Sequence, residues 1–570
     1  MIRSVSVVTL LGFLVGCVVA IAAVGFVEAI VWLNDALFVS PRSRMLAANE
    51  PWLVAVTIAV PTLGGLVVGV LCALIPDRRP HGPADAIYTA QSMEGAMPAR
   101  AGALTAAAAC VGLGAGASVG QYGPLVHMGA SLGSWISRVA GAGRYLGTIA
   151  IGCGAAAAIS TAFNAPIAGL VFAHEVILRH YSLRAFAPIT VSATLGYVVA
   201  NVVFERPPLF RIEDVQVVSP YEYLAFIGIG MAGAVIAMVY MRAIMVSGRI
   251  SQNLPLPGPV KPALAGMMLG IVALQIPDVL GIGKEVLRFA IIEGAFTPPE
   301  LAVTLVAKLV VTALCLGFGF AGGVFSPALL IGILFGALAG TGMEWLAGDD
   351  RSHIAIYAVC GMVAVTSPVI GAPLTTILIV FELTRNYDLA TAAMVSVAFA
   401  NLIGYRIFGR SLFDRQLLSR GFDLSLGRDK VMMRQRTLRE FLSSDYTKVA
   451  PTTPLIAVRD ALIADGRSEA YVVTESGAYT GTVTMNRLME LAVADSSLNG
   501  DAAAYAVPEP LVLSPDDSIW DAMSRLESFV GESIPVVEES RLMGVVPEAA
   551  IVQAYLHTLE EIRREENAAA

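Results

Sequence analysis

Long uncharged stretches of apolar residues are the feature that most restricts how this chain can fold. Several of them exceed the roughly 20 residues that a helix needs to cross a bilayer. They include residues 4–27, 52–76, 185–204, 309–343 and, together with its flanks, 389–405. Residues 101–137 and 309–343 are too long for one ordinary span and are rich in glycine, so each is expected to hold a span and a broken or re-entrant helix. The pattern predicts an all-α polytopic membrane protein in a lipid bilayer.

Charge divides the chain into two parts. Charged residues make up 14% of the sequence, whereas soluble domains carry about 25%. Residues 428–570 hold 13 basic and 23 acidic side chains, while the rest of the chain is nearly balanced. We therefore predict a membrane domain over residues 1–425 and a cytoplasmic domain over residues 426–570. The six cysteines are isolated, with no spacing typical of a metal or redox site, so no metal is expected.

Two motifs of the membrane domain occur twice. Gly120–Pro124 and Gly323–Pro327 both read Gly-x-aromatic-small-Pro, with glycines five and nine residues after the proline. An Ala-Pro pair also precedes Glu175 and Glu382, with the proline nine residues before each glutamate. Motifs repeated in the same order indicate a duplicated half. Transporters built from such repeats bind substrate at the repeat interface near the midplane, and an inverted repeat would bring both Gly-Pro elements there.

These Gly-Pro elements suit a small anion. Proline is tolerated in the first turn of a helix, and small neighbours allow backbone amides to approach a ligand. A helix N-terminus carries roughly +0.5 of an elementary charge and unpaired N–H groups. Two such ends could hold a monovalent anion weakly enough to release it, as conduction requires. Pro80–Ala84 is a third candidate, read either as the start of a short helix or as a simple loop.

Taken together, these segments resemble the CLC family of chloride channels and chloride/proton exchangers. Its Gly-Ser-Gly-Ile-Pro-type, Gly-Arg/Lys-Glu-Gly-Pro and Gly-x-Phe-x-Pro segments correspond in order to Pro80–Ala84, Gly120–Pro124 and Gly323–Pro327. Phe163–Glu175 and Ala372–Thr384 also match, so the resemblance covers nearly all of residues 1–420.

The resemblance implies a CLC-type inverted repeat of about 18 helices, including re-entrant ones. It also implies a homodimer with one anion pathway per subunit, contacts through helices near 164–200 and 369–405, and both termini in the cytosol. We expect the bacterial inner membrane as the location. The implied anion-binding residues are His81, Gly82, Gln121, Tyr122, Gly123, Val324, Phe325 and Phe413.

Departures from the family pattern concern proton coupling. The gating glutamate of the family falls at Tyr122, and a phenol with pKa near 10 stays neutral at ordinary pH. Tyr122 is therefore the expected gate, acting as a plug or as a hydrogen-bond donor to the anion. The inner proton-transfer glutamate of exchangers falls at Val176, which carries no proton. His174 could relay protons together with its neighbour Glu175, although a packed or water-facing histidine is the simpler interpretation.

The inner anion site departs as well. The family places a Ser and a Tyr hydroxyl there, and this chain has His81 and Phe413 at those positions. Losing both hydroxyls weakens an inner constriction. His127, three residues after Pro124, is expected to pack or to hydrogen-bond within its helix.

The tail contains a second, shorter repeat and resembles a pair of CBS domains, over about 436–497 and 502–560. Such pairs often bind adenine nucleotides through an aspartate, but the two matching positions are Arg487 and Ala550. We therefore favour a structural or dimer-stabilising tail over a nucleotide sensor and expect no cofactor, with chloride bound only as the transported ion.

Three functions compete. The first is a passive chloride channel, because Tyr122 and Val176 remove both carboxylates of proton exchange. The second is a proton-coupled chloride antiporter that uses Tyr122, His174 or bound water. The third is a membrane enzyme or a sensor that signals through the tail. The sequence has no nucleophile–base pair, metal cluster or phosphate loop, so we expect no enzyme activity and no nucleic-acid partner.

Overall fold

The computed structural model describes residues 2–47, 50–92, 96–208, 212, 215–347, 351–424, 428–494, 498–507, 511–526, 529 and 531–567. The chain forms two compact units, Met1–Phe422 and Asp423–Ala570. The domain boundary expected at 425/426 and the end of the first CBS repeat at 497 lie outside the described residues.

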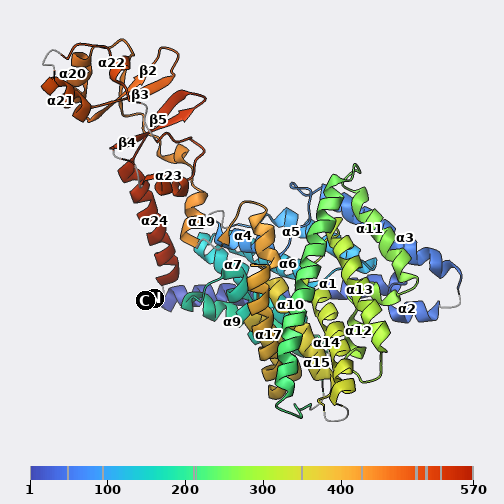
Figure 1. Cartoon of the computed structure of the whole chain (residues 1–570). Coiled ribbons are helices and arrows are strands. Elements are labelled where there is room, and N and C mark those ends of the chain that lie inside the picture. Colours follow the sequence, from blue (N-terminus) through green and yellow to red (C-terminus); the bar gives the residue numbers. More distant parts are fainter. Residues whose placement is uncertain are drawn as a thin grey trace. The chain divides into compact units, whose positions relative to one another are not determined.

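The first unit consists of helices (Figure 1). Its first part contains α1 (Ile2–Ala36), α2 (Pro41–Leu46), α3 (Trp52–Ala73), α4 (Pro83–Gln91), α5 (Ala99–Gly114), α6 (Tyr122–Val139), α7 (Arg144–Phe163), α8 (Pro166–Phe172), the π-helix η1 (Ala173–Leu178), α9 (Leu183–Val198) and the π-helix η2 (Val199–Val203). Its second part contains α10 (Glu222–Asn253), α11 (Val260–Ala273), the 3₁₀ turn η3 (Pro277–Val279), α12 (Lys284–Phe289), α13 (Pro298–Gly317), α14 (Phe325–Ala347), α15 (Ile354–Ile370), α16 (Pro373–Thr384), α17 (Tyr387–Ile407) and α18 (Leu412–Leu418).

Eight of the described helical segments are long and apolar enough to cross a membrane. Both over-long apolar stretches are broken as the sequence predicts. The first divides into α5 and α6, and the second belongs to α13 and α14, with each break immediately before a Gly-Pro element. The predicted all-helical membrane domain is confirmed.

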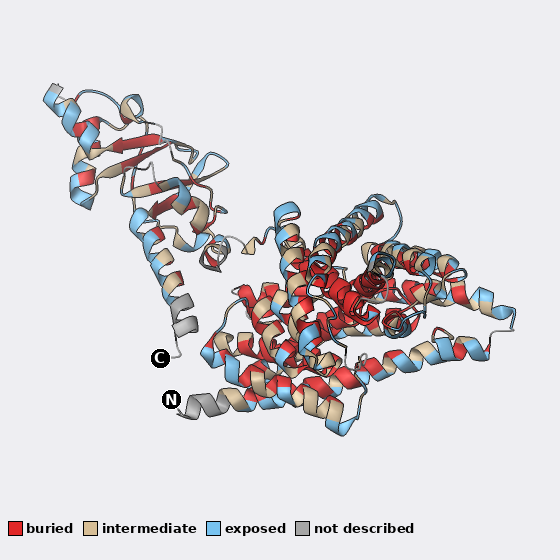
Figure 2. Ribbon diagram, turned by 60° about the horizontal axis from the view of Figure 1, so that its bottom comes forward, coloured by how far each residue is buried: buried red, intermediate tan, exposed pale blue. Residues whose placement is uncertain are grey.

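Helices α7 and α15 form the centre of this unit. Every residue of α15 is buried, and most residues of α7 are buried too (Figure 2). A helix that is apolar on all sides is stable in a protein core or in lipid, and the burial of α7 and α15 shows that the protein core surrounds these two. The two helices match in the repeat, because each ends in a left-handed residue, Asn164 or Gly371, followed by Ala-Pro.

The motif glycines allow close helix packing. A Cβ atom at Gly129 of α6 would lie 2.4 Å from the carbonyl oxygen of Gly154 in α7. At the matching position, a Cβ atom at Gly332 of α14 would lie 2.6 Å from the carbonyl oxygen of Gly361 in α15. The glycines after each proline therefore bring α6 onto α7 and α14 onto α15 at backbone contact distance.

Two glutamates complete the internal symmetry. The Glu175 carboxylate accepts hydrogen bonds from the amides of Leu374 and Thr375 at the start of α16, both 2.9 Å long. The Glu382 carboxylate accepts from the amides of Ile167 and Ala168 at the start of α8, at 2.9 and 2.7 Å. Each half thus caps a helix of the other half, as an inverted repeat predicts.

The second unit is a small α/β structure built on two similar halves. The list of its elements is α19 (Arg428–Arg434), η5 (Leu438–Phe441), β1 (Thr447–Val449), α20 (Leu455–Asp465), β2 (Glu469–Val473), β3 (Tyr479–Thr484), α21 (Met485–Ala494), α22 (Ala502–Tyr505), α23 (Ile519–Arg525), β4 (Ser533–Glu538), β5 (Arg541–Pro547) and α24 (Glu548–Asn567). The parallel β1–β2 pair has a counterpart in the parallel bridge between Leu513 and Val536, and β2–β3 and β4–β5 are both antiparallel.

Candidate anion pathway

The two Gly-Pro elements meet in the structure. The amide of Gly120 donates to the carbonyl of Gly323, and the amide of Gly323 donates to the carbonyl of Gly120, both at 2.7 Å. This antiparallel pair brings the starts of α6 and α14 together in the interior of the helical unit. The first amides of a helix have no acceptor within their own helix, so both ends expose donors and partial positive charge at one place.

The third element, the start of α4, joins them. A Cβ atom at Gly123 would lie 2.6 Å from Gly323 Cα and 3.7 Å from Cδ of Pro83. Gly123 therefore lies against Gly323 too closely for any side chain, with Pro83 of the third segment at van der Waals distance from the same point. Pro83 is the first residue of α4, so the helical reading of Pro80–Ala84 is the one that the structure shows.

Three aromatic rings pack beside this junction. The ring centroid of Tyr122 lies 4.0 Å from that of Phe163 and 5.4 Å from that of Phe325, and the last two are 5.2 Å apart. All three side chains are almost completely buried. Tyr122, the expected gate, is thus held by aromatic neighbours from both halves of the repeat. At the position where the family has a carboxylate, this chain has a packed cluster of aromatic rings.

Sequence reasoning missed two residues of this region. Phe163 is the first residue of a segment that matches the family, and its ring packs against Tyr122 and Phe325 at the junction. Tyr240 of α10 is fully buried, and its hydroxyl lies 3.5 Å from the carbonyl oxygen of Val324. Nothing in the sequence around Tyr240 distinguishes it from a residue of an ordinary apolar span.

Several buried polar atoms at the junction have no hydrogen-bond partner among the described residues. They include the side-chain oxygens of Gln121 and Ser326, at the starts of α6 and α14. Burying a polar group without a partner is costly, so such groups commonly face a ligand or water. Their position beside the free helix amides fits a site for a small ion.

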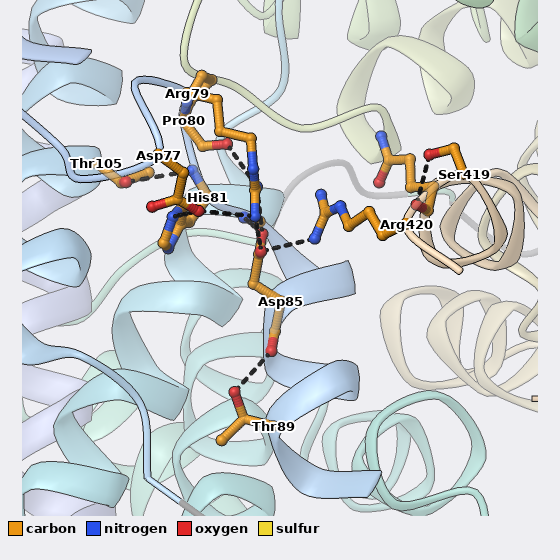
Figure 3. A network of polar contacts seen from close by, with 11 residues as sticks. Asp77, Arg79, Pro80, His81, Asp85, Thr89, Thr105, Ser419 and Arg420 are labelled. Carbon is orange, nitrogen blue, oxygen red and sulfur yellow. Dashed lines mark hydrogen bonds and ion pairs between the residues drawn. The ribbon is translucent and has the colours of Figure 1, made fainter. Parts of the chain in front are cut away.

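The α4 end of the site is held by charged groups (Figure 3). The Asp85 carboxylate accepts hydrogen bonds from Arg79 at 2.7 Å, Arg420 at 2.7 Å and the Gly82 amide at 2.8 Å. Burial alone would raise the pKa of Asp85, but the hydrogen bond from Arg79 and the charge of Arg420 hold this pKa well below its usual range. The network fixes Gly82 and the neighbouring His81 at the start of α4.

His81 and Phe413, the two residues predicted at the inner anion site, have different surroundings. The Nε2 atom of His81 lies 3.0 Å from a carboxylate oxygen of Asp77, and its ring meets that of buried His127 edge-on at 5.4 Å. Neither ring nitrogen of His127 has a partner among the described residues. Phe413 is buried at the start of α18, which packs against α4 and α15, and its ring makes no described contact with the Tyr122 cluster.

The three residues considered for proton transfer lie elsewhere, on the π-helix η1. His174 is buried, its Nδ1 lies 2.9 Å from the carbonyl oxygen of His180, and its Nε2 has no partner among the described residues. Glu175 caps α16, and Val176 is buried. His174 and Glu175 both line a separate cavity of about 450 Å³.

Comparison with known proteins decides the family. The profile of the family described as "Voltage gated chloride channel" matches residues 64–405. This chain belongs to the CLC chloride channel family. A second profile, that of the CBS domain, matches residues 502–557.

Individual CLC relatives support the same assignment. A putative chloride channel protein, ClcB-like, of Ralstonia nicotianae is 29% identical over 417 residues, which cover 71% of this chain and 95% of the relative. Among solved structures, a slow cyanobacterial Cl⁻/H⁺ antiporter has a TM-score of 0.66 at 22% identity, covering 73% of this chain and 97% of that one. A eukaryotic CLC transporter has a TM-score of 0.63 at 19% identity and covers 96% and 99%. At these identities the structures show the CLC fold alone.

Proposed function

We propose that this CLC protein conducts chloride or a similar small anion passively, through one pathway in each subunit of a homodimer. The paired backbones of Gly120 and Gly323 carry the proposal, because they hold two helix N-termini against one point. Amide donors and helix dipoles attract a dehydrated anion without the strong binding of a full positive charge. We propose transport without catalysis, so the protein is not an enzyme.

Passive conduction is supported by the residues at the two proton-transfer positions. Tyr122 is packed between aromatic rings and Val176 is apolar and buried. Neither side chain exchanges a proton at ordinary pH. A carboxylate that occupies the anion site and leaves it when protonated would couple anion movement to proton movement. Without such a carboxylate, anion movement is not coupled to protons.

The homodimer is typical of the CLC family, and exposed apolar side chains on the helices expected to form its contact are compatible with it. Helices α8, α9, α16 and α17 present exposed apolar side chains: Ile167, Leu183, Phe186, Leu374, Phe381, Met394 and Leu402. Such a surface needs lipid or a partner to cover it. We place the protein in the bacterial inner membrane with both termini in the cytosol.

Flux and voltage measurements in liposomes test the function. Under a chloride gradient, purified protein should give a reversal potential at the chloride equilibrium value, and a pH gradient should not shift it. External pH should stay constant during chloride efflux. A reversal potential displaced by the pH gradient, with matching proton uptake, would refute passive conduction.

A proton-coupled antiporter is the alternative, and one observation favours it. The buried Nε2 atom of His174 has no partner among the described residues, and the residue lines the 450 Å³ cavity together with Glu175. Imidazole is a group that can take up and release a proton, so a relay through His174 is chemically feasible. The same liposome experiment on His174→Gln would then show lost proton movement with the chloride pathway intact.

A further inference from the structure

A second cavity opens at the Gln121 end of the pathway. It encloses about 1000 Å³ and is walled by the end of α1, by α2 and by residues 277–289, and it reaches Gln121 directly before Tyr122. Its walls are tied to the α5–α6 connection. The amide of Gly281 donates to the carbonyl of Gly116 at 2.8 Å, and the side-chain amide of Asn34 donates to the carbonyl of Leu113 at 2.8 Å. The cavity is therefore held in place by backbone and side-chain hydrogen bonds and forms an entrance, or mouth, to the candidate pathway.

Lys284 stands in this mouth. It is the first residue of α12, after Gly283, whose left-handed φ of 73° turns the chain at that point. The lysine is half-buried, lines the cavity and has no hydrogen bond or ion pair with any described residue. Gln121, at the inner end of the cavity, is neutral. Any positive charge that attracts an anion into this mouth is therefore carried by another residue.

The other charges of the cavity are exposed or already engaged. Asp35, Arg42 and Glu285 are exposed, where water and salt screen them. Half-buried Arg44 keeps its positive charge, but a 3.0 Å hydrogen bond from its guanidinium to the hydroxyl of Thr57 holds the side chain against α3. Half-buried Asp278 interacts with the charge of Lys308.

Charges close to Lys284 outside the cavity lining are also largely engaged. Arg206 pairs with Glu28 at 3.5 Å, while Arg288 lies on the same short helix as Lys284. Behind the wall, Lys308 donates to the carbonyls of Val279 and Gly281 at 3.0 and 2.7 Å. Arg44 and Lys284 are thus the half-buried cations among the described residues that line the mouth, and of these two only the ammonium of Lys284 has no hydrogen bond to hold it in place.

We propose that Lys284 draws hydrated anions into this mouth and sets the rate at which they reach Tyr122. The proposal rests on the anion conduction proposed above. A lysine suits the task because its ammonium is a strongly hydrated point charge on a flexible stem, which attracts an anion without a rigid bidentate grip. Partial burial lengthens the reach of this charge, since it is screened less than a surface charge.

The charge state of Lys284 adds a pH signature. Burial is the main cause that lowers the pKa of Lys284 to about 8, followed by the charge of Arg206. The charge of Arg288 also lowers this pKa, whereas the carboxylates of Glu285 and Glu28 raise it. The ammonium is therefore mostly charged at pH 7 and is lost as the pH on this side rises through 8. Arginine at this position would keep its charge throughout.

Chloride efflux from liposomes tests the role of Lys284. In Lys284→Gln, flux should fall about tenfold at low ionic strength, with much of the difference gone at high salt, because electrostatic steering is screened. Lys284→Arg should restore the flux and abolish the decline above pH 8 that the wild type shows. The matched control is Lys261→Gln on α11, which removes the same charge from a lysine that donates to the Ser251 carbonyl and does not line the cavity.

The outcomes separate the two proposals. A wild type that carries no chloride refutes the proposed function. A conducting wild type with equal flux in Lys284→Gln at low salt refutes only the role of Lys284. A loss that is equal at all salt concentrations and is not rescued by arginine also refutes it, because it shows a structural role.

Discussion

Gly120 and Gly323 lie 203 residues apart in the sequence, yet each backbone donates a 2.7 Å hydrogen bond to the other. The pair fixes where Tyr122 and Phe325 stand, because each aromatic residue follows its glycine by two positions. A Cβ atom at Gly323 would lie 2.6 Å from the amide nitrogen of Gly123, closer than real Cβ contacts allow. The contact between the halves therefore depends on the absence of a side chain.

Gly323→Ala should reduce chloride flux by about tenfold, equivalent to roughly 1.4 kcal/mol of barrier. The added methyl group forces the starts of α6 and α14 apart and misplaces their amide donors. Chloride efflux from liposomes measures the effect. Gly342→Ala, within α14, is the control, because a Cβ atom there meets nothing within 4 Å. Unchanged flux in Gly323→Ala would argue against an anion site at the junction.

Tyr122→Ala should raise chloride flux, because the ring stands in the expected gate position. It should also lower the free energy of unfolding by about 3–5 kcal/mol, as large-to-small changes in an aromatic core do. Tyr122→Phe keeps the ring and should conduct like the wild type. Equal flux in all three proteins would show that the ring does not obstruct the anion.

Glu175→Gln and Glu382→Gln should each lower stability by about 1 kcal/mol, because a carboxylate at a helix N-terminus is favoured by the dipole and by the free amides. Thermal unfolding of the purified protein gives the comparison. The chloride reversal potential should stay unchanged in both variants if conduction is passive. A change in proton movement in Glu175→Gln alone would support the relay that the antiporter alternative needs.

Asp85→Asn should destabilise the protein at neutral pH by on the order of 3 kcal/mol, because Arg79 and Arg420 lose a shared, mostly buried partner. The folded-state pKa of Asp85 is depressed, so its contribution is present above the unfolded-state value near 3.9 and is lost as the pH falls towards the folded-state value.

The Asp85→Asn difference should therefore shrink only in strongly acidic solution. Denaturant unfolding as a function of pH measures it. Asp77→Asn is the control, since Asp77 is more exposed and its ion pairs with Arg79 and His81 are expected to contribute less. An equal cost for both variants would contradict the central role given to Asp85.

The sequence predicted the elements that meet at the junction but not the side chains that fill it. Motif repetition identified Gly120–Pro124 and Gly323–Pro327 as partners, because a duplicated half leaves matching residues at nearly the same offset, 203 residues for these elements and 207 for the two glutamates. The helix breaks before Tyr122 and Phe325 were predicted from the length of the apolar stretches, well above the roughly 20 residues of one span, together with their glycines and prolines.

What the sequence could not supply were contacts that depend on three-dimensional packing. Tyr240 and Phe163 read as ordinary apolar residues until α10 and α7 are placed against the junction. The role of Asp85 was hidden for a related reason, because its partner Arg420 lies 335 residues away. Lys284 is distinguished only by the cavity around it, which α1, α2 and a distant loop form together.

The reciprocal backbone hydrogen bonds between Gly120 and Gly323 imply that both halves of the duplication are needed to form the proposed ion site. Each half of the duplication supplies one backbone of the contact and one of the two helix starts, so a half produced alone would contain only one side of the proposed ion site. Two separately expressed fragments, cut between α9 and α10, would have to find each other before either gained a function.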